Sequence, residues 1–358
     1  MKQVVSISLG SSDKDYAFNT EFLGQDFAIR RMGTDGDLEK AAKLLLRMDK
    51  EADAIGLGQI KYPYGIGPRY LNKTKHRKIR DLGAQVQTPV TIGSTLRDVS
   101  FEWALRYIEY KFGNYFSNAR VLFFSGMYSY RIAKVMSEFT DNLTFADPIL
   151  ENGIPKFINS LKDLKAYAHS AHEVLQWVPS QRLTHSVVPI KAWNDYILRK
   201  AMQKATILVV PNYGFDDYLK NATLEELGGK TIISATVDDE RVAFLKERGV
   251  DVIIDTTPKI LEHVVAPNVL EALIIAALGR NRDQVRADDL LELISADEDA
   301  AQRQVGIVGV NGGNMLEGWL ELIDRYQPAI LAACQAAAGD GQTDLDFCRV
   351  DKDEFLAC

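Results

Sequence analysis

The residue types best suited to chemistry lie just after predicted strands, and the first such pair is a lysine and an acid. Lys61 follows a buried apolar run at 54–58, and Asp98 precedes a predicted helix at 99–112. Oxidation of an alcohol needs a base for the hydroxyl proton as hydride leaves, and a lysine or a carboxylate performs that step. We therefore predict Lys61 and Asp98 as catalytic residues. Lys73 is an alternative base, although its basic neighbours are typical of a solvated face. The alternative role for Asp98 is to stabilise a helix dipole.

A second group of residues has the order of a dinucleotide-binding βαβ unit. An apolar strand at 121–124 precedes a turn at Ser125 and Gly126, a helical pattern follows, and a second strand at 142–147 ends in Asp147. Free amides at the start of such a helix attract a diphosphate, and an acid after the second strand meets the ribose hydroxyls. The predicted cofactor-binding residues are Ser125, Gly126, Met127, Tyr128, Ser129, Asp147, Thr236 and Thr256.

The predicted cofactor is NAD or NADP. Asp147 favours NAD, because a carboxylate repels the 2′-phosphate of NADP, whereas the nearby Arg131 weakens that preference. The turn holds one glycine, whereas the dinucleotide fingerprint G-x-G-x-x-G holds three. The alternative is therefore an α/β domain whose cleft is empty or altered.

Polar residues at other strand ends are candidates for holding a small substrate. Ser11 follows the first predicted strand, Asp35 lies in a glycine-containing loop after the second, and Thr95 precedes the linking helix. Ligands of open α/β sheets bind outside the carboxyl ends of the strands. We predict that Ser11, Asp35 and Thr95 contact substrate hydroxyls. The loop with Asp35 alternatively only caps the helix predicted at 38–49.

Two histidines and an acid are candidate metal ligands. His169 and His172 lie three residues apart on a predicted helix, with Glu173 adjacent. Imidazole and carboxylate groups bind zinc, but the H-E-x-x-H spacing is absent. We predict no metal site and expect these residues on a polar helix face.

Strands and helices alternate along most of the chain, which predicts an α/β fold of two domains. Residues 1–115 are assigned to an N-terminal α/β substrate domain, and 116–265 to a Rossmann-like parallel sheet that binds the dinucleotide. Residues 266–358 are assigned to a helix that returns to the first domain and to a helical C-terminal extension. The predicted strands are 4–9, 27–32, 54–58, 121–124, 142–147, 205–210, 230–234 and 251–255. A glycine-rich stretch at 306–314 leads into a predicted amphipathic helix at 315–326.

This order of parts resembles the shikimate/quinate dehydrogenase family, especially its divergent quinate 5-dehydrogenase-like members, over about residues 1–279. Thr95 and, two residues late, Asp98 are similar to the family's N-T-D motif, whose aspartate binds a substrate hydroxyl. The segment around Lys61 is similar to the loop that carries the family's catalytic lysine. The turn at 125–127 stands where the family has a G-A-G-G-type turn. The resemblance implies NAD(P)-dependent oxidation of a small hydroxylated, anionic substrate.

Composition narrows the remaining classes of function. The 358 residues carry a formal net charge of −7, which disfavours nucleic acid and anionic membranes as partners. No stretch approaches the ~20 apolar residues of a membrane span. The sequence enters a strand directly, so we expect no signal peptide and a cytoplasmic location. Apolar helices with exposed aromatic residues are compatible with a homodimer.

Two functions are therefore expected from the sequence. The first is an NAD(P)-dependent oxidoreductase acting on a small-molecule substrate. The alternative is a catalytically inactive Rossmann-like module that binds or regulates through protein partners.

Overall fold

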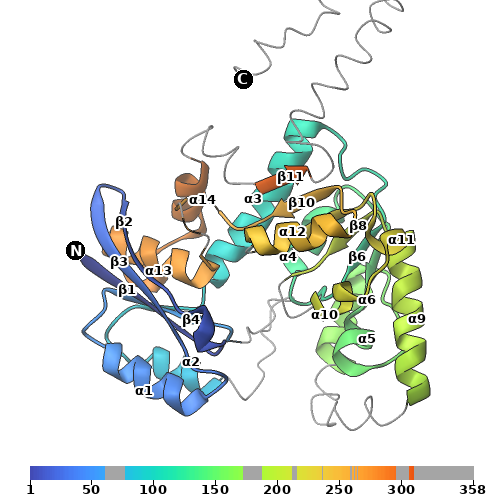
Figure 1. Ribbon diagram of the computed structural model, residues 1–358. Helices are drawn as coiled ribbons and strands as arrows, with labels where there is room; N and C mark the ends of the chain where they lie inside the picture. Colours follow the sequence, from blue (N-terminus) through green and yellow to red (C-terminus); the bar gives the residue numbers. More distant parts are fainter. Residues whose placement is uncertain are drawn as a thin grey trace, which may run out of the picture.

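The protein consists of two α/β units, each built on its own sheet (Figure 1). The computed structural model describes residues 1–60, 77–171, 188–211, 216–235, 237–258, 260–261, 263, 265–295 and 306–309. The predicted α/β fold class is confirmed, including a mainly parallel, Rossmann-like second sheet. None of the described helices is long and apolar enough to cross a membrane.

The first unit holds a five-stranded sheet in the order β2-β3-β1-β4-β5. The strands β3, β1, β4 and β5 are parallel, while β2 is an antiparallel edge strand that forms a hairpin with β3. Numbered along the chain, the parallel strands therefore follow the order 2-1-3-4. The strands are β1 (Lys2–Ser8), β2 (Ala17–Phe22), β3 (Gln25–Gly33), β4 (Ala54–Gly58) and β5 (Val90–Thr91).

Helices cover both faces of this sheet because successive strand residues point to opposite sides. Val5 and Ile7 of β1 pack with α1 (Leu38–Met48) and α2 (Arg77–Gly83) on one face. Val4 packs with α13 (Pro267–Leu278) on the other. Figure 1 shows the orange α13 among the blue strands, so a late helix completes the N-terminal core.

The close fit of α13 depends on small residues in the sheet. A side chain at Gly56 or Gly93 would meet the backbone of Asn268. The buried Glu271 accepts a hydrogen bond from the Leu96 N–H at 2.8 Å and another from the Thr91 hydroxyl. A carboxylate from α13 therefore caps α3 (Ser94–Phe112), the helix that links the two units and also packs against α14 (Ala287–Ser295).

The second unit holds a six-stranded sheet in the order β11-β10-β9-β8-β6-β7. Five of its strands are parallel and follow the order 2-1-3-4-5 along the chain, and β11 is antiparallel to β10. The strands are β6 (Val121–Phe123), β7 (Leu143–Phe145), β8 (Ile207–Val209), β9 (Thr231–Ser234), β10 (Val252–Asp255) and β11 (Gly306–Gly309).

Alternating strand residues again divide between two layers of helices. Phe123 and Val209 face α3, α4 (Tyr130–Met136) and α6 (Leu161–Ala166), whereas Leu122 and Leu208 face the opposite layer. That opposite layer consists of α9 (Val188–Lys204), α10 (Asp216–Lys220), α11 (Leu224–Leu227) and α12 (Asp239–Glu247). The remaining helix, α5 (Asp147–Asn152), follows β7 directly.

Three strands were not predicted from the sequence. The hairpin strand β2 and the two-residue β5 lack a long apolar run. Residues 306–309, which begin the glycine-rich stretch, pair with β10 as β11, and the helix predicted at 315–326 lies outside the described residues. Isolated edge strands depend on a neighbouring strand for their hydrogen bonds, so their own sequence indicates them weakly.

Candidate functional site

The carboxyl ends of the parallel strands define the candidate site, because both sheets reverse their strand order next to the first strand. Ligands of such sheets bind outside the strand ends at this reversal point. In the first unit the turn after β1 holds Ser11 and Ser12, and in the second the turn after β6 holds Ser125 to Ser129.

In the first turn of the second unit, the backbone N–H groups are occupied by the carboxyl group of Asp147. The N–H groups of Gly126 and Met127 donate to the two carboxylate oxygens of Asp147, at 2.8 and 2.9 Å. Asp147 is fully buried at the end of β7, and the Ser125 hydroxyl lies 3.5 Å from its Oδ1. The carboxylate therefore satisfies the amides that an anionic ligand would otherwise bind.

Burial makes this carboxylate hard to ionise. Loss of solvation, followed by repulsion from Glu151 one turn along α5, raises the pKa of Asp147 to about 7, against the opposing effect of the two amides. Burial and the same two acids also raise the pKa of Tyr167, whose hydroxyl donates to Asn152. The turn thus adjoins one carboxyl group, that of Asp147, whose pKa lies near neutral pH.

This geometry corrects the expectation that the turn offers free amides to a diphosphate and that Asp147 reaches a ribose. Asp147 accepts the Gly126 and Met127 N–H groups instead. The single glycine is needed for internal packing, because a Cβ at Gly126 would meet the rings and methyl groups of Phe145 and Leu164. The helix after the turn begins only at Tyr130 and spans seven residues.

Of the other predicted cofactor residues, Ser129 and Tyr128 belong to this turn, and Thr256 follows β10. Ser129 is fully buried and Tyr128 is half-buried. The N–H and the hydroxyl of Thr256 both donate to the Ser234 carbonyl at 2.8 Å, so this residue extends the link between β9 and β10. Thr236 lies outside the described residues.

The first turn of the N-terminal unit is closed in the same way by Asp35, which follows β3. The Ser12 N–H donates to Asp35 Oδ1 at 2.7 Å, and the Ser12 hydroxyl donates to Oδ2 at 3.0 Å. Asp35 has a φ of +53°, a conformation that aspartate tolerates better than most residues, and this backbone points its side chain back to the turn. Ser11, the other predicted residue, is exposed and caps the short 3₁₀ turn 12–14.

Asp35 differs from Asp147 in its exposure to water. The hydrogen bonds from Ser12 are the main reason that the pKa of Asp35 is lowered, with Lys40 adding a weaker effect from 3.7 Å. The expected alternative that Asp35 caps the following helix is wrong, because that cap is Asp37, which accepts the Glu39 and Lys40 N–H groups.

The two units meet at the start of α3, where the structure places two predicted residues. Asp98 pairs with Arg97 at 2.9 Å and with Arg131 of α4 at 3.9 Å. The Arg97 guanidinium lies 4.9 Å from the centre of the Tyr128 ring, in the first turn of the second unit. Thr95 is half-buried one turn before Asp98. Thr95, Asp98 and the turn at 125–129 are therefore close, whereas Lys61 lies outside the described residues.

Two charged residues of this region were missed in the sequence. Arg97 is 8% exposed and lies on the same helix face as Phe101, four residues later. Glu151 lies four residues after Asp147 on α5 and affects its ionisation. In both cases the partner, Phe101 or Asp147, lies four residues away on the same helix, and this spacing could have indicated the contact from the sequence. The spacing does not indicate whether the pair is buried.

The described residues contain no group of three histidine, cysteine or acidic side chains placed to hold a metal ion. Of the three metal candidates, His169 lies in a short π-helical turn, Tyr167–Ala171, while His172 and Glu173 fall outside the described residues.

The chain has local similarity to one curated protein and a weak likeness to solved structures. It is 50% identical over 40 residues to the mannose-1-phosphate guanylyltransferase ManC of Salmonella typhimurium, a match that spans 11% of this chain and 8% of that protein. The arabinose-transporter periplasmic binding protein of Shewanella sp. ANA-3, bound to arabinofuranose, has a TM-score of 0.35 and 10% identity, covering 84% of this chain and 97% of that chain.

A structure from Mycobacterium smegmatis in complex with β-D-fucofuranose has a TM-score of 0.34 and 8% identity, covering 86% of this chain and 99% of that chain. Because these scores and identities are low, what those proteins bind is not transferred to this chain.

Two protein families match consecutive parts of the sequence. Residues 3–92, which contain the first sheet, match the family described as domain of unknown function (DUF8753). Residues 95–298, from the start of α3 to just beyond α14, match the family described as domain of unknown function (DUF8754). The second match spans more than half of the 358 residues, so the chain belongs to the DUF8754 family.

Proposed function

We propose that this protein binds a small hydroxylated molecule between the carboxyl edges of its two sheets, as a binding or regulatory module that does not depend on a dinucleotide. One observation carries the proposal. In each unit an acid after the second parallel strand, Asp35 or Asp147, accepts hydrogen bonds from the first turn. A phosphate brought to either turn meets a carboxyl group rather than free amides, and at Asp35, whose lowered pKa keeps it charged, the two like charges also repel.

The charges at the edges favour hydroxyl groups as the recognised chemistry. Each carboxylate oxygen accepts more than one hydrogen bond, so the half-exposed Asp35 and Asp98 retain capacity for ligand hydroxyls. Thr95 adds a hydroxyl one turn from Asp98. The contact between Arg97 and Tyr128 keeps the start of α3 beside the first turn of the second unit. A ligand seated here touches both units.

Thermal-shift titration followed by calorimetry tests the proposal with a panel of sugars, polyols and hydroxy acids, beside NAD and NADP. We expect at least one panel member to raise Tm, and millimolar NAD or NADP to leave it unchanged. The Asp35→Asn and Asp98→Asn variants should each weaken calorimetric binding about tenfold, since a charge-assisted hydrogen bond is lost. Asp26→Asn is the matched control, because Asp26 is exposed at the amino end of β3 and carries the same charge.

Two results would contradict the proposal. If no sugar, polyol or hydroxy acid binds, the edges do not form a site for hydroxylated ligands. If Asp26→Asn weakens binding as much as Asp35→Asn, the effect comes from net charge and the placement of the site is wrong.

An NAD(P)-dependent oxidoreductase is the second candidate function. It is favoured by the position of Asp147 after the second strand of a parallel sheet, where dinucleotide-binding domains carry their ribose-binding acid. It requires Asp147 to leave the amides of Gly126 and Met127. Stabilisation by NAD or NADP in the same titration, with a smaller shift for Asp147→Asn because the ribose-binding carboxylate is lost, would favour this candidate over the first.

A further inference from the structure

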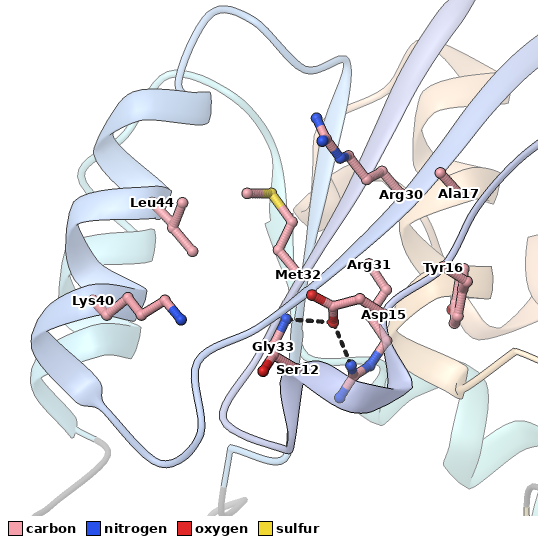
Figure 2. A pocket seen from close by; sticks show the side chains of 10 residues that line it. All are labelled: Ser12, Asp15, Tyr16, Ala17, Arg30, Arg31, Met32, Gly33, Lys40 and Leu44. Atoms are coloured by element: carbon pink, nitrogen blue, oxygen red, sulfur yellow. Dashed lines mark hydrogen bonds and ion pairs between the residues drawn. The ribbon is translucent and has the colours of Figure 1, made fainter.

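A pocket beside the Asp35 turn of the N-terminal unit supports an inference about a second ligand, of a different chemical class from the one proposed above. The pocket measures 450 Å³ and lies between α1 and the hairpin of β2 and β3 (Figure 2). The residues that matter for its chemistry are Arg30, Arg31, Met32, Lys40, Leu44 and Asp15.

The strand and helix periods explain why these side chains share one space. Arg30 and Met32 are two residues apart on β3 and so point to the same face, toward α1. Ala17 of β2 is the cross-strand partner of Arg30 and lies on that face too. Lys40 and Leu44 are four residues apart on α1 and point back toward β3. The pocket thus has cations beside an apolar floor.

The acids near the pocket neutralise only part of this positive charge. Asp15 binds Arg31 at 2.6 Å and also accepts the Gly33 N–H at 2.6 Å (Figure 2). Asp15 therefore neutralises Arg31, and the pair lines one side of the pocket. Lys40 lies 3.7 Å from Asp35, and both side chains are half-exposed, which makes their attraction weak. Among the described residues, Arg30 forms no ion pair.

We propose that this pocket binds a small organic carboxylate whose apolar arm lies against Met32 and Leu44. The Arg30 guanidinium holds the carboxylate by two parallel N–H donors, and Lys40 adds a second positive charge. Half-buried Met32 and Leu44 give the arm a surface to cover. The chain as a whole carries a net charge of −7, so an anion that binds does so because of local residues rather than overall charge.

The methyl group of Met32 provides a direct readout on the full-length protein. With ¹³C-methyl methionine, hexanoate is titrated and compared with hexanamide, which has the same shape and no charge. We expect a saturable shift of the Met32 signal, assigned with Met32→Leu, for hexanoate and a far weaker one for hexanamide. The signal of Met127, buried in the second unit, should not move.

A matched pair of double variants separates the pocket from general surface charge. Arg30→Gln with Lys40→Gln should raise the hexanoate Kd about tenfold or more, because both charged partners are lost. Lys43→Gln with Arg47→Gln removes the same two residue types from exposed positions of α1 outside the pocket, and should change Kd less than about twofold.

Three results would overturn the inference. They are the absence of a saturable Met32 shift, equal binding of hexanamide, and equal weakening by the two double variants. Circular dichroism and an unmoved Met127 signal in each variant verify that the fold is intact.

Discussion

The first turns of the two sheets have the same design and opposite electrostatics. In both, an acid at the end of the second parallel strand accepts hydrogen bonds from the turn after the first. Asp35 is half-exposed and its pKa is lowered, whereas Asp147 is fully buried and its pKa is raised to about 7. The comparison shows that a shared hydrogen-bond pattern does not fix the charge of the acid, because burial sets the cost of ionisation.

Removal of the two carboxylates should separate the turns most clearly. Asp147→Ala leaves the buried Gly126 and Met127 N–H groups without their acceptor, so we expect a loss of about 4 kcal/mol in the free energy of unfolding at pH 5. Asp35→Ala should cost much less, since water reaches the Ser12 N–H and hydroxyl. Urea unfolding measures both. Equal losses would show that the difference in burial has no energetic consequence.

A pH series should give the next largest difference. An acid whose folded pKa is raised contributes stability below its unfolded pKa of about 4 and loses it as pH rises through the folded value. From pH 5 to pH 7 the contribution of Asp147 should fall by about 2–3 kcal/mol. The measurement is the unfolding free energy of the wild type minus that of Asp147→Asn at each pH.

Asp35 provides the control with the opposite sign. Its lowered pKa stabilises the fold above the unfolded pKa of about 4, and that contribution is lost only as pH falls further. Asp35→Asn should therefore leave the profile between pH 5 and pH 7 unchanged. A flat difference for Asp147→Asn over the same range would break the comparison, because the buried acid would then behave like the exposed one.

More of the fold than of the candidate site could be predicted from the sequence. Apolar runs such as 121–124 and 205–210 identified buried strands, because fully buried parallel strands read as continuous hydrophobic segments. The turn at 125–129 and Asp147 were found, but not that they bind each other. A strand followed by a turn and an acid has the same sequence whether the amides face a ligand or a carboxylate 20 residues away. Only the three-dimensional closeness of Gly126 and Asp147 decides this.

Alanine substitution of a glycine in each turn is a third test, because it compares how tightly side chains pack against the two turns. A Cβ at Gly126 would meet Phe145 and Leu164, which are both fully buried, so Gly126→Ala should cost about 2 kcal/mol by overpacking. A Cβ at Gly10 would lie 2.7 Å from the Gln59 amide nitrogen and 2.9 Å from the Arg31 guanidinium. Both contacts are the ends of long side chains that can move aside.

We therefore expect Gly10→Ala to cost less than about 0.5 kcal/mol, as for most substitutions away from rigid packing. Urea unfolding of the two alanine variants gives the result directly. If Gly10→Ala is the more damaging substitution, the first turn is the more rigidly packed one, and its tolerance of an exposed acid needs another explanation.

The smallest effect is expected where the two units meet, at the ion pair of Asp98 and Arg131. The two groups are 3.9 Å apart and partly exposed, and Asp98 already pairs with Arg97 at 2.9 Å. Pairs of this kind contribute little, so a double-mutant cycle of Asp98→Asn and Arg131→Gln should give a coupling of about 0.5 kcal/mol that salt removes. A coupling above about 2 kcal/mol that persists in salt is a value typical of a desolvated contact. It would mean that the contact between the start of α3 and α4 excludes water, as the buried Asp147 turn does and the exposed Asp35 turn does not.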